Sequence, residues 1–194
     1  MKLLALDTST DYLSIAIAED EKIVGRLHKN APRSHSSLLM PMIDRLFKKT
    51  RLKLADMDYF CIGAGPGSFT GLRIGVSTVK GLAFVAGRPI AAVPTFDAIA
   101  LNARTLCGTI CPVLDARKGK VYGCFYRSDG KGSVKRDSDY LLVPVEELLK
   151  KAKEYDNLYY LGDYAERIPG AVIATAKWHP RADMIARIGL QMVR

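Results

Sequence analysis

Residues 62–75 read IGAGPGSFTGLRIG, and this glycine-rich stretch decides the fold. An apolar run, Tyr59 to Ile62, precedes it and predicts a buried strand. A segment of small and apolar residues, Leu72 to Ala86, follows it and predicts a helix. Between the two, Gly-Pro-Gly permits a tight turn, because glycine accepts positive φ and proline fixes its own φ. The hydroxyl of Ser68 or Thr70 can then cap the helix, so the stretch predicts a strand, a glycine turn and a helix.

A turn of this kind directs backbone N–H groups and a helix N-terminus toward one point, which suits anions. Two common phosphate-binding patterns nevertheless fail on spacing. The P-loop requires a lysine directly after its last glycine, and no lysine follows any of these glycines. The dinucleotide pattern G-x-G-x-x-G fails because Thr70 stands where the third glycine belongs, and no acidic ribose partner occurs around Arg88. The sequence therefore disfavours a bound dinucleotide.

Small residues recur every four positions along the predicted helix, at Gly67, Gly71 and Gly75, and again at Ala83 and Gly87 after Val79. Residues four apart share a helix face, so this face is nearly bare backbone. Each glycine inside a helix costs about 1 kcal/mol relative to alanine, and close contact with another element would offset that cost. Two interpretations stay open. The face packs on this chain's own sheet, or it receives a helix of a partner protein.

Length and composition indicate a globular protein. The 194 residues suit one large domain or two small lobes, and the apolar and charged fractions, 48% and 25%, are ordinary for a soluble chain. No apolar run is expected to reach the roughly 18 residues of a membrane span. Asp7 interrupts the N-terminal apolar stretch too early for a signal peptide. We therefore expect a cytoplasmic protein that does not associate with a membrane.

The chain is strongly basic. Lys and Arg together number 29 against 20 Asp and Glu, which gives a formal net charge of +9. Such an excess favours RNA or acidic protein surfaces as partners. The basic residues cluster within residues 45–53, 117–120 and 131–136. None of these clusters interleaves aromatic residues as a stacking platform for single strands would, so solvated basic faces are the alternative interpretation.

The sequence predicts no catalytic residue and no metal site. His35 has no second histidine four residues later, and neither His28 nor His179 belongs to an H-E-x-x-H motif. No Ser-His-Asp arrangement and no complete phosphate loop can be assigned either. We therefore expect a protein that is not an enzyme by itself.

The opening of the chain recurs 108 residues later, because Leu6-Asp7 corresponds to Leu114-Asp115. The strands that follow the two turns match in phase, with Leu13, Ile15 and Ile17 against Val121, Gly123 and Phe125. A repeated unit of strand, aspartate-containing turn and strand predicts two related lobes. We assign residues 1–104 to an N-terminal lobe and residues 105–194 to a shorter, degenerate C-terminal lobe.

Two such lobes describe the actin-like ATPase (ASKHA) architecture, a two-lobed α/β fold. In active members of that fold, aspartates at these turns hold the water ligands of Mg²⁺. Asp7, Thr8, Ser9 and Asp115 are therefore weak candidates for nucleotide binding in a cleft between the lobes, and no other cofactor is expected. Because no glycine-rich loop accompanies these aspartates, the alternative that they cap their turns is favoured.

Three segments of the chain resemble the TsaB family, which is also called YeaZ. They are residues 65–75, GPGSFTGLRIG, with residues 6–10 before them and residues 114–117 after them. The resemblance spans nearly the whole chain. It implies a subunit of the bacterial machinery that forms threonylcarbamoyladenosine on tRNA, in which this chain forms a heterodimer with the related subunit TsaD and activates it. TsaD carries the metal and the catalytic residues, a small ATPase called TsaE completes the complex, and tRNA is reached through the complex.

The resemblance also implies where partners bind, at a pair of helices near residues 34–49 and 70–86. The residues expected at the interface with TsaD, or with a second copy of this chain when TsaD is absent, are Leu39, Met42, Ile43, Gly71, Ile74, Gly75 and Thr78. Two other functions are weighed against this one. The missing histidine pair disfavours a glycoprotease-like metallopeptidase, and the short second half disfavours an independent nucleotide-binding phosphotransferase.

Overall fold

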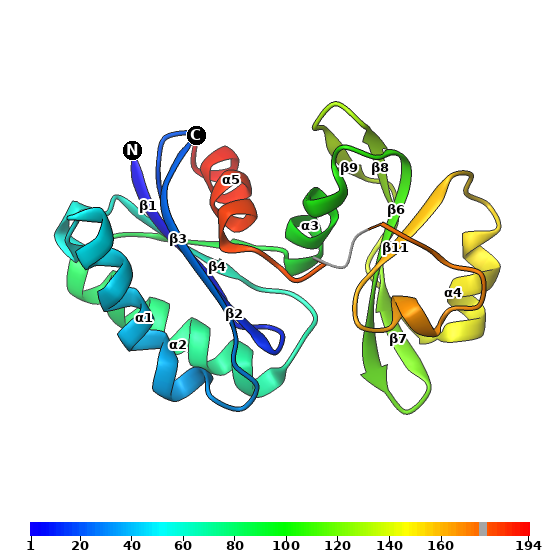
Figure 1. Cartoon of the computed structure of the whole chain (residues 1–194), viewed down its shortest axis with the longest axis horizontal. Coiled ribbons are helices and arrows are strands. Elements are labelled where there is room, and N and C mark those ends of the chain that lie inside the picture. The colour runs from blue at the N-terminus through cyan, green and yellow to red at the C-terminus, as the bar shows by residue number, and fades with distance from the viewer. Residues whose placement is uncertain (175–177) are drawn as a thin grey trace. The chain divides into compact units, whose positions relative to one another are not determined.

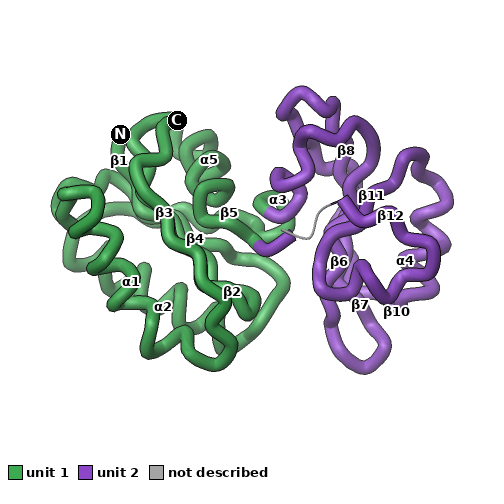
Figure 2. Tube along the Cα trace, viewed as in Figure 1, with its two compact units in different colours: residues 1–98, 180–194 green, residues 99–179 purple. Residues whose placement is uncertain are grey.

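The computed structural model describes residues 1–174 and 178–194, and it divides into two compact units (Figure 2). Unit 1 comprises residues 1–98 and 180–194, and unit 2 comprises residues 99–179. The predicted boundary after residue 104 is therefore displaced to residue 98. The prediction that residues 180–194 belong to the second lobe is wrong, because the last helix packs on the sheet of unit 1.

Unit 1 contains a five-stranded sheet with the strand order β3-β2-β1-β4-β5. Strands β1 (Lys2–Asp7), β2 (Tyr12–Glu19) and β3 (Lys22–Asn30) form the antiparallel meander. Strand β4 (Tyr59–Gly63) runs parallel to β1, and β5 (Ile90–Val93) runs parallel to β4. Parallel strands need crossover connections, and in this unit those connections are helices.

Helices α1 (His35–Thr50) and α2 (Phe69–Ala86) cover one face of this sheet, and α5 (Ala182–Val193) covers the other (Figure 1). The turn Leu54–Asp56, η1, leads from α1 into β4. The observed α2 is the helix predicted from the glycine-rich stretch, and it begins at Phe69, directly after the predicted capping residue Ser68.

The two faces of β2 carry side chains of different size. The large residues are fully buried in the core formed with α1 and α2, and they are Leu13, Ile15 and Ile17. Side chains alternate along a strand, so Ser14 lies on the opposite face, where its Oγ accepts a hydrogen bond from N of Ala182 at 2.8 Å. In α5, a Cβ at Gly189 would overlap Sγ of Cys61 in β4. Helix α5 therefore approaches the sheet closely, through small residues.

Unit 2 repeats this topology in a second sheet, whose main path runs β10-β7-β6-β11-β12. Strand β7 is antiparallel to both β6 and β10, whereas β11 is parallel to β6 and β12 is parallel to β11. The order and directions match those of unit 1 strand for strand, which confirms the predicted duplication. The five strands are β6 (Cys107–Arg117), β7 (Lys120–Gly123), β10 (Leu141–Pro144), β11 (Leu158–Leu161) and β12 (Val172–Ile173).

Unit 2 is the reduced copy. Helix α4 (Val145–Ala152) has 8 residues where the corresponding α1 has 16, and only the turn η3 (Ala165–Arg167) stands where α2 would be. The sheet is extended instead by β8 (Tyr126–Asp129) and β9 (Val134–Arg136), because β8 pairs with β6 and with β9. The remaining elements are α3 (Thr95–Ala100) and η2 (Leu101–Ala103).

Candidate functional site

The glycine turn places the start of α2 against the turn that follows β1. Oγ1 of Thr8 donates a hydrogen bond to O of Gly71 at 2.7 Å. N of Ser68 donates to O of Ser9 at 2.6 Å. Oγ of Ser68 accepts from N of Gly71 at 3.2 Å, so Ser68 is the capping residue of the two that the sequence allowed. The two turns are thereby joined by hydrogen bonds from both sides.

The glycines of α2 provide the space for this contact. A Cβ at Gly71 would overlap the carbonyl O of Thr8, and a Cβ at Gly75 would overlap Oγ1 of the same residue. Gly81 differs, because a Cβ there would have no neighbour within 4 Å. The small-residue face thus packs on this chain's own sheet, and its buried members are Gly71, Gly75, Val79 and Ala83. The prediction that Gly71 and Gly75 lie at a partner interface is therefore wrong.

Three further residues predicted at the interface also lie in the core of unit 1. Leu39, Met42 and Ile43 are 1%, 9% and 2% exposed. Their helical periodicity marks the face of α1 that packs on the sheet, which a partner cannot reach. Ile74 and Thr78 are partly exposed at the border of the buried face of α2. Only these last two of the seven residues remain available to a partner.

Large apolar side chains lie instead on the outer sides of α1 and α2. The exposed fractions are 49% for Met40, 66% for Phe69, 88% for Phe84 and 76% for Val85. Phe69 and Phe84 are 15 residues apart, which at about 100° per residue places them within about 60° of each other around the helix. The guanidinium Cζ of Arg73 lies 3.9 Å from the ring centroid of Phe69. These exposed apolar residues are the candidates for contact with a partner.

Helix α2 is also long and apolar enough, by length and composition, to cross a membrane. The helix is not an uninterrupted apolar run of the kind that the sequence analysis excluded, because Arg73 and Lys80 lie within it. Its glycine face nevertheless packs on the sheet of unit 1, which makes it a layer of an α/β structure. Its other side carries the exposed apolar residues Phe69, Phe84 and Val85.

Asp7 is fully buried at the end of β1. Its Oδ1 accepts hydrogen bonds from N and Oγ of Ser9, both at 2.8 Å. Within the described part of the chain, its Oδ2 has no hydrogen-bond partner, and a Cβ at Gly63 would overlap it. Burial raises the pKa of Asp7 to about 6, although the hydrogen bonds from Ser9 act to lower it. Asp7 therefore caps its turn, and the hydroxyls of Thr8 and Ser9 are also engaged within the chain.

The corresponding turn of unit 2 is more exposed. Oδ1 of Asp115 accepts a hydrogen bond from N of Arg117 at 2.7 Å, and its Oδ2 pairs with Nη1 of Arg167 at 3.2 Å. The hydrogen bond from Arg117 lowers the pKa of Asp115, desolvation raises it, and Arg167 lowers it further. N of Asp115 donates to Oδ1 of Asp163 at 2.8 Å. Asp115 is thus a second turn-capping carboxylate. In residues 1–174 and 178–194, no three His, Cys, Asp or Glu side chains group as metal ligands.

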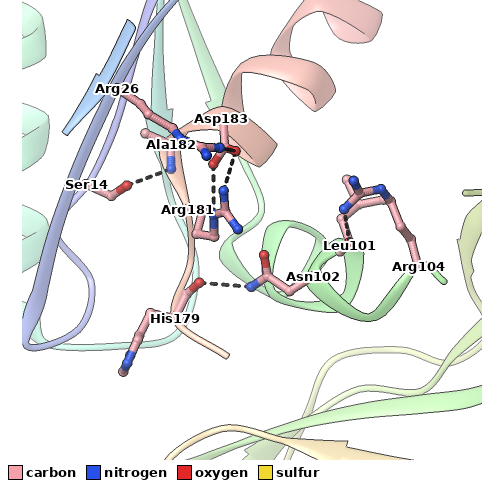
Figure 3. A network of polar contacts seen from close by, with 9 residues as sticks. All are labelled: Ser14, Arg26, Leu101, Asn102, Arg104, His179, Arg181, Ala182 and Asp183. Atoms are coloured by element: carbon pink, nitrogen blue, oxygen red, sulfur yellow. Dashed lines mark hydrogen bonds and ion pairs between the residues drawn. The ribbon is translucent and has the colours of Figure 1, made fainter. Parts of the chain in front are cut away.

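A network of charged residues fixes the start of α5 on unit 1 (Figure 3). The carboxylate of Asp183, whose side chain is 5% exposed, accepts from Nη1 of Arg26 and Nη2 of Arg181, both at 2.7 Å. Within unit 2, Nδ2 of Asn102 donates to the carbonyl O of His179 at 2.9 Å. A buried carboxylate needs such partners to compensate its charge. No signal in the sequence marked Asp183, because Arg26 is 157 residues away.

Two units with the same strand order, each with an aspartate at the turn after its first strand, define a protein of the actin-like ATPase fold. The activator of the 2-hydroxyisocaproyl-CoA dehydratase from Clostridium difficile shares this fold with the chain. The two structures superpose with a TM-score of 0.53 at 12% sequence identity. The match covers 99% of this chain and 95% of that chain.

Closer relatives identify the family. A family model described as TsaD, tRNA N6-adenosine threonylcarbamoyltransferase, matches residues 14–167. The tRNA threonylcarbamoyladenosine biosynthesis protein TsaB of Bacillus subtilis is 34% identical over 153 residues, which are 78% of this chain and 67% of that protein. The TsaB of Haemophilus influenzae is 38% identical over 125 residues, 63% of this chain and 52% of that protein. The chain belongs to the TsaB (YeaZ) family.

A solved structure agrees with this assignment. The crystal structure of an uncharacterized protein with similarity to peptidase YeaZ, from Pseudomonas aeruginosa, has a TM-score of 0.85 at 30% identity. The match covers 100% of this chain and 92% of that one. The sequence matches to the curated relatives span less of those proteins, between 52% and 67% of the lengths of three TsaB proteins.

Proposed function

We propose that this chain is a non-catalytic subunit that binds and activates a TsaD-type transferase during formation of N6-threonylcarbamoyladenosine on tRNA. The relatives support this proposal, because they are named tRNA threonylcarbamoyladenosine biosynthesis proteins. The complex acts in the cytoplasm with a TsaE-type ATPase, and tRNA binds to the assembled complex. In the absence of TsaD, two copies of this chain pair through the same surface.

The observation that carries the proposal is the uncovered outer side of α2. Phe69 and Phe84 are 66% and 88% exposed, whereas the glycine face of the same helix packs on the sheet. Desolvating large aromatic side chains is a main source of affinity in protein interfaces. Because the matching family model is named for the transferase, a TsaD-type subunit shares this fold and can offer an equivalent pair of helices. We therefore assign the heterodimer interface to the exposed apolar residues of α1 and α2.

The turns of the two units support a role without chemistry. Oδ1 of Asp7 and the hydroxyls of Thr8 and Ser9 are buried and bonded within unit 1. Oδ2 of Asp7 is buried without a hydrogen-bond partner among the described residues. The carboxylate of Asp115 is held by N of Arg117 and by the side chain of Arg167. Side chains that are engaged in this way hold their turns in place, and the proposal leaves the transfer step to the TsaD-type subunit.

The test is co-expression of this chain with its TsaD-type partner, followed by size-exclusion chromatography and an affinity measurement. Phe84→Glu should weaken the heterodimer by roughly 30-fold or more, since truncating a central aromatic residue typically costs 2 kcal/mol or more. Leu142→Glu is the matched control, because Leu142 is 53% exposed in unit 2. Threonylcarbamoyl incorporation into a tRNA transcript should fall in parallel with the loss of the heterodimer.

A double substitution makes this test decisive. Phe69→Glu combined with Phe84→Glu should leave the melting temperature of the isolated chain nearly unchanged, because both side chains are exposed. If this variant still binds the partner with wild-type affinity, the interface lies elsewhere. If the wild-type chain associates with lipid vesicles and the variant does not, the apolar residues of α2 serve a membrane.

A further inference from the structure

We propose that the β6–β7 turn of unit 2 binds the phosphate backbone of RNA. The turn consists of Arg117, Lys118, Gly119 and Lys120. The assignment rests on the proposed function only for the choice of tRNA as the ligand. The four residues follow the turn-capping carboxylate of Asp115. All four are exposed at the end of a hairpin. Three independent observations carry the proposal: the backbone conformation, the charge and the shape of the turn.

The backbone conformation does not account for the residue types in the turn. Arg117 pairs opposite Lys120, which leaves Lys118 and Gly119 as a two-residue loop. These two have φ values of 52° and 72°, as in a type I′ turn, for which Asn-Gly or Gly-Gly is the usual sequence. Arg117 also has a positive φ, 69°. The left-handed region costs non-glycine residues about 1–2 kcal/mol each. Glycine or asparagine would form this turn with less strain, so the basic side chains require another explanation.

The two lysines of the turn carry its uncompensated positive charge, whereas Arg117 interacts electrostatically with Asp115 and Asp163. Arg117, Lys118 and Lys120 form no ion pair with any carboxylate that the structure describes. The carboxylate at the base of the turn, Asp115, is already engaged, because it accepts from N of Arg117 and from the side chain of Arg167. The side chain of Arg167 is 61% exposed, and its charge compensates that of Asp115 at the base of the turn.

The shape of the turn suits an extended polyanion. Strand β10 ends at Pro144 opposite Lys120, so Lys118 and Gly119 extend past the last pair of that strand. Figure 1 shows this hairpin projecting at the lower end of unit 2. Small ligands usually bind in concave sites, whereas phosphates along a nucleic acid are contacted by projecting Arg and Lys side chains. The turn has no apolar residue of the kind that forms the centre of a protein interface, which favours RNA over an acidic protein.

The test measures binding of an in vitro transcribed tRNA to the whole chain by fluorescence anisotropy over a series of KCl concentrations. The variant is Lys118→Gln with Lys120→Gln. The matched control is Lys150→Gln with Lys153→Gln, which removes the same charge from exposed positions of unit 2 in and just after α4. Loss of two phosphate contacts should make the slope of log K against log salt shallower by about 1.4–1.8. Electrostatic contacts contribute little at 1 M salt, so the variant and the wild-type chain should bind equally there. At 0.1 M KCl, one decade lower, the Kd of the variant should then exceed that of the wild-type chain roughly 25- to 60-fold.

The control should retain the wild-type slope, and both variants should unfold at the wild-type temperature. Equal losses in the two variants would overturn the proposal, because only total charge would then matter. An unchanged slope in the turn variant, or no binding by the wild-type chain at 50 mM KCl, would overturn it as well. Loss of TsaD binding with intact tRNA binding would assign the turn to a protein contact. The proposed function fails separately, since its test is heterodimer formation by Phe84→Glu.

Discussion

Alanine substitution at Gly75 and at Gly81 distinguishes the two sides of α2 with one chemical change. Each substitution removes the cost of a glycine inside a helix, which is about 1 kcal/mol. At Gly81 the new Cβ has no neighbour within 4 Å, so the gain remains. At Gly75 the Cβ would overlap Oγ1 of Thr8 and lie 3.1 Å from Cδ1 of Ile62. We therefore expect opposite effects on the free energy of unfolding.

The magnitude at Gly75 follows from what must move. Thr8 is fully buried, and its Oγ1 donates to O of Gly71 at 2.7 Å. Overpacking costs about 1–3 kcal/mol, and the displaced hydrogen bond contributes about 0.5–1.5 kcal/mol. After the gain of about 1 kcal/mol in helix propensity, Gly75→Ala should destabilise by about 0.5–3.5 kcal/mol. Gly81→Ala should stabilise by about 1 kcal/mol, so the two variants should differ by about 1.5–4.5 kcal/mol.

Urea unfolding monitored by circular dichroism measures this difference, provided that the m-value is the same in both variants. Adding Thr8→Ala to Gly75→Ala should recover part of the loss, because it removes the atoms that the new Cβ would overlap. If Gly75→Ala stabilises the chain as much as Gly81→Ala does, the glycine face does not pack on the turn after β1. Packing of a partner helix on that face would then regain its place as the explanation.

Two further predictions concern the interior of unit 1. Burial raises the pKa of Asp7 from 3.8 to about 6, so the unfolded chain binds fewer protons than the folded chain between these values and stability falls as pH rises through them. Relative to its effect at pH 2, Asp7→Asn should therefore gain about 3 kcal/mol in stability above pH 7. Asp11→Asn is the exposed control. An effect of Asp7→Asn that does not depend on pH would contradict this prediction. Gly189→Ala should destabilise, because its Cβ would overlap Sγ of Cys61. Adding Cys61→Ala to Gly189→Ala should recover at least about 1 kcal/mol of the free energy of unfolding. If the effects of the two substitutions are strictly additive, the two residues are not in contact.

The local elements and the duplication could be predicted from the sequence. The apolar run before the glycine turn and the small-residue segment after it became β4 and α2, because strand and helix periods depend only on neighbouring residues. The repeat of Leu6-Asp7 at Leu114-Asp115 predicted two related units, and both sheets have the same strand order. The carboxylates of these repeats cap their turns through N–H groups two residues later, an interaction that is also local.

The tertiary structure alone decided which side of each helix is covered. Periodicity shows which residues share a face, but it does not show which of two apolar faces meets the sheet. In α2 the glycine side met the sheet and Phe84 was left outside, so the interface predicted at Gly71 and Gly75 was wrong. The return of α5 to unit 1 depends on contacts such as that of Arg26 with Asp183, 157 residues apart. Contacts at that separation leave no periodic signal in the sequence, because they depend on how the whole chain folds back on itself.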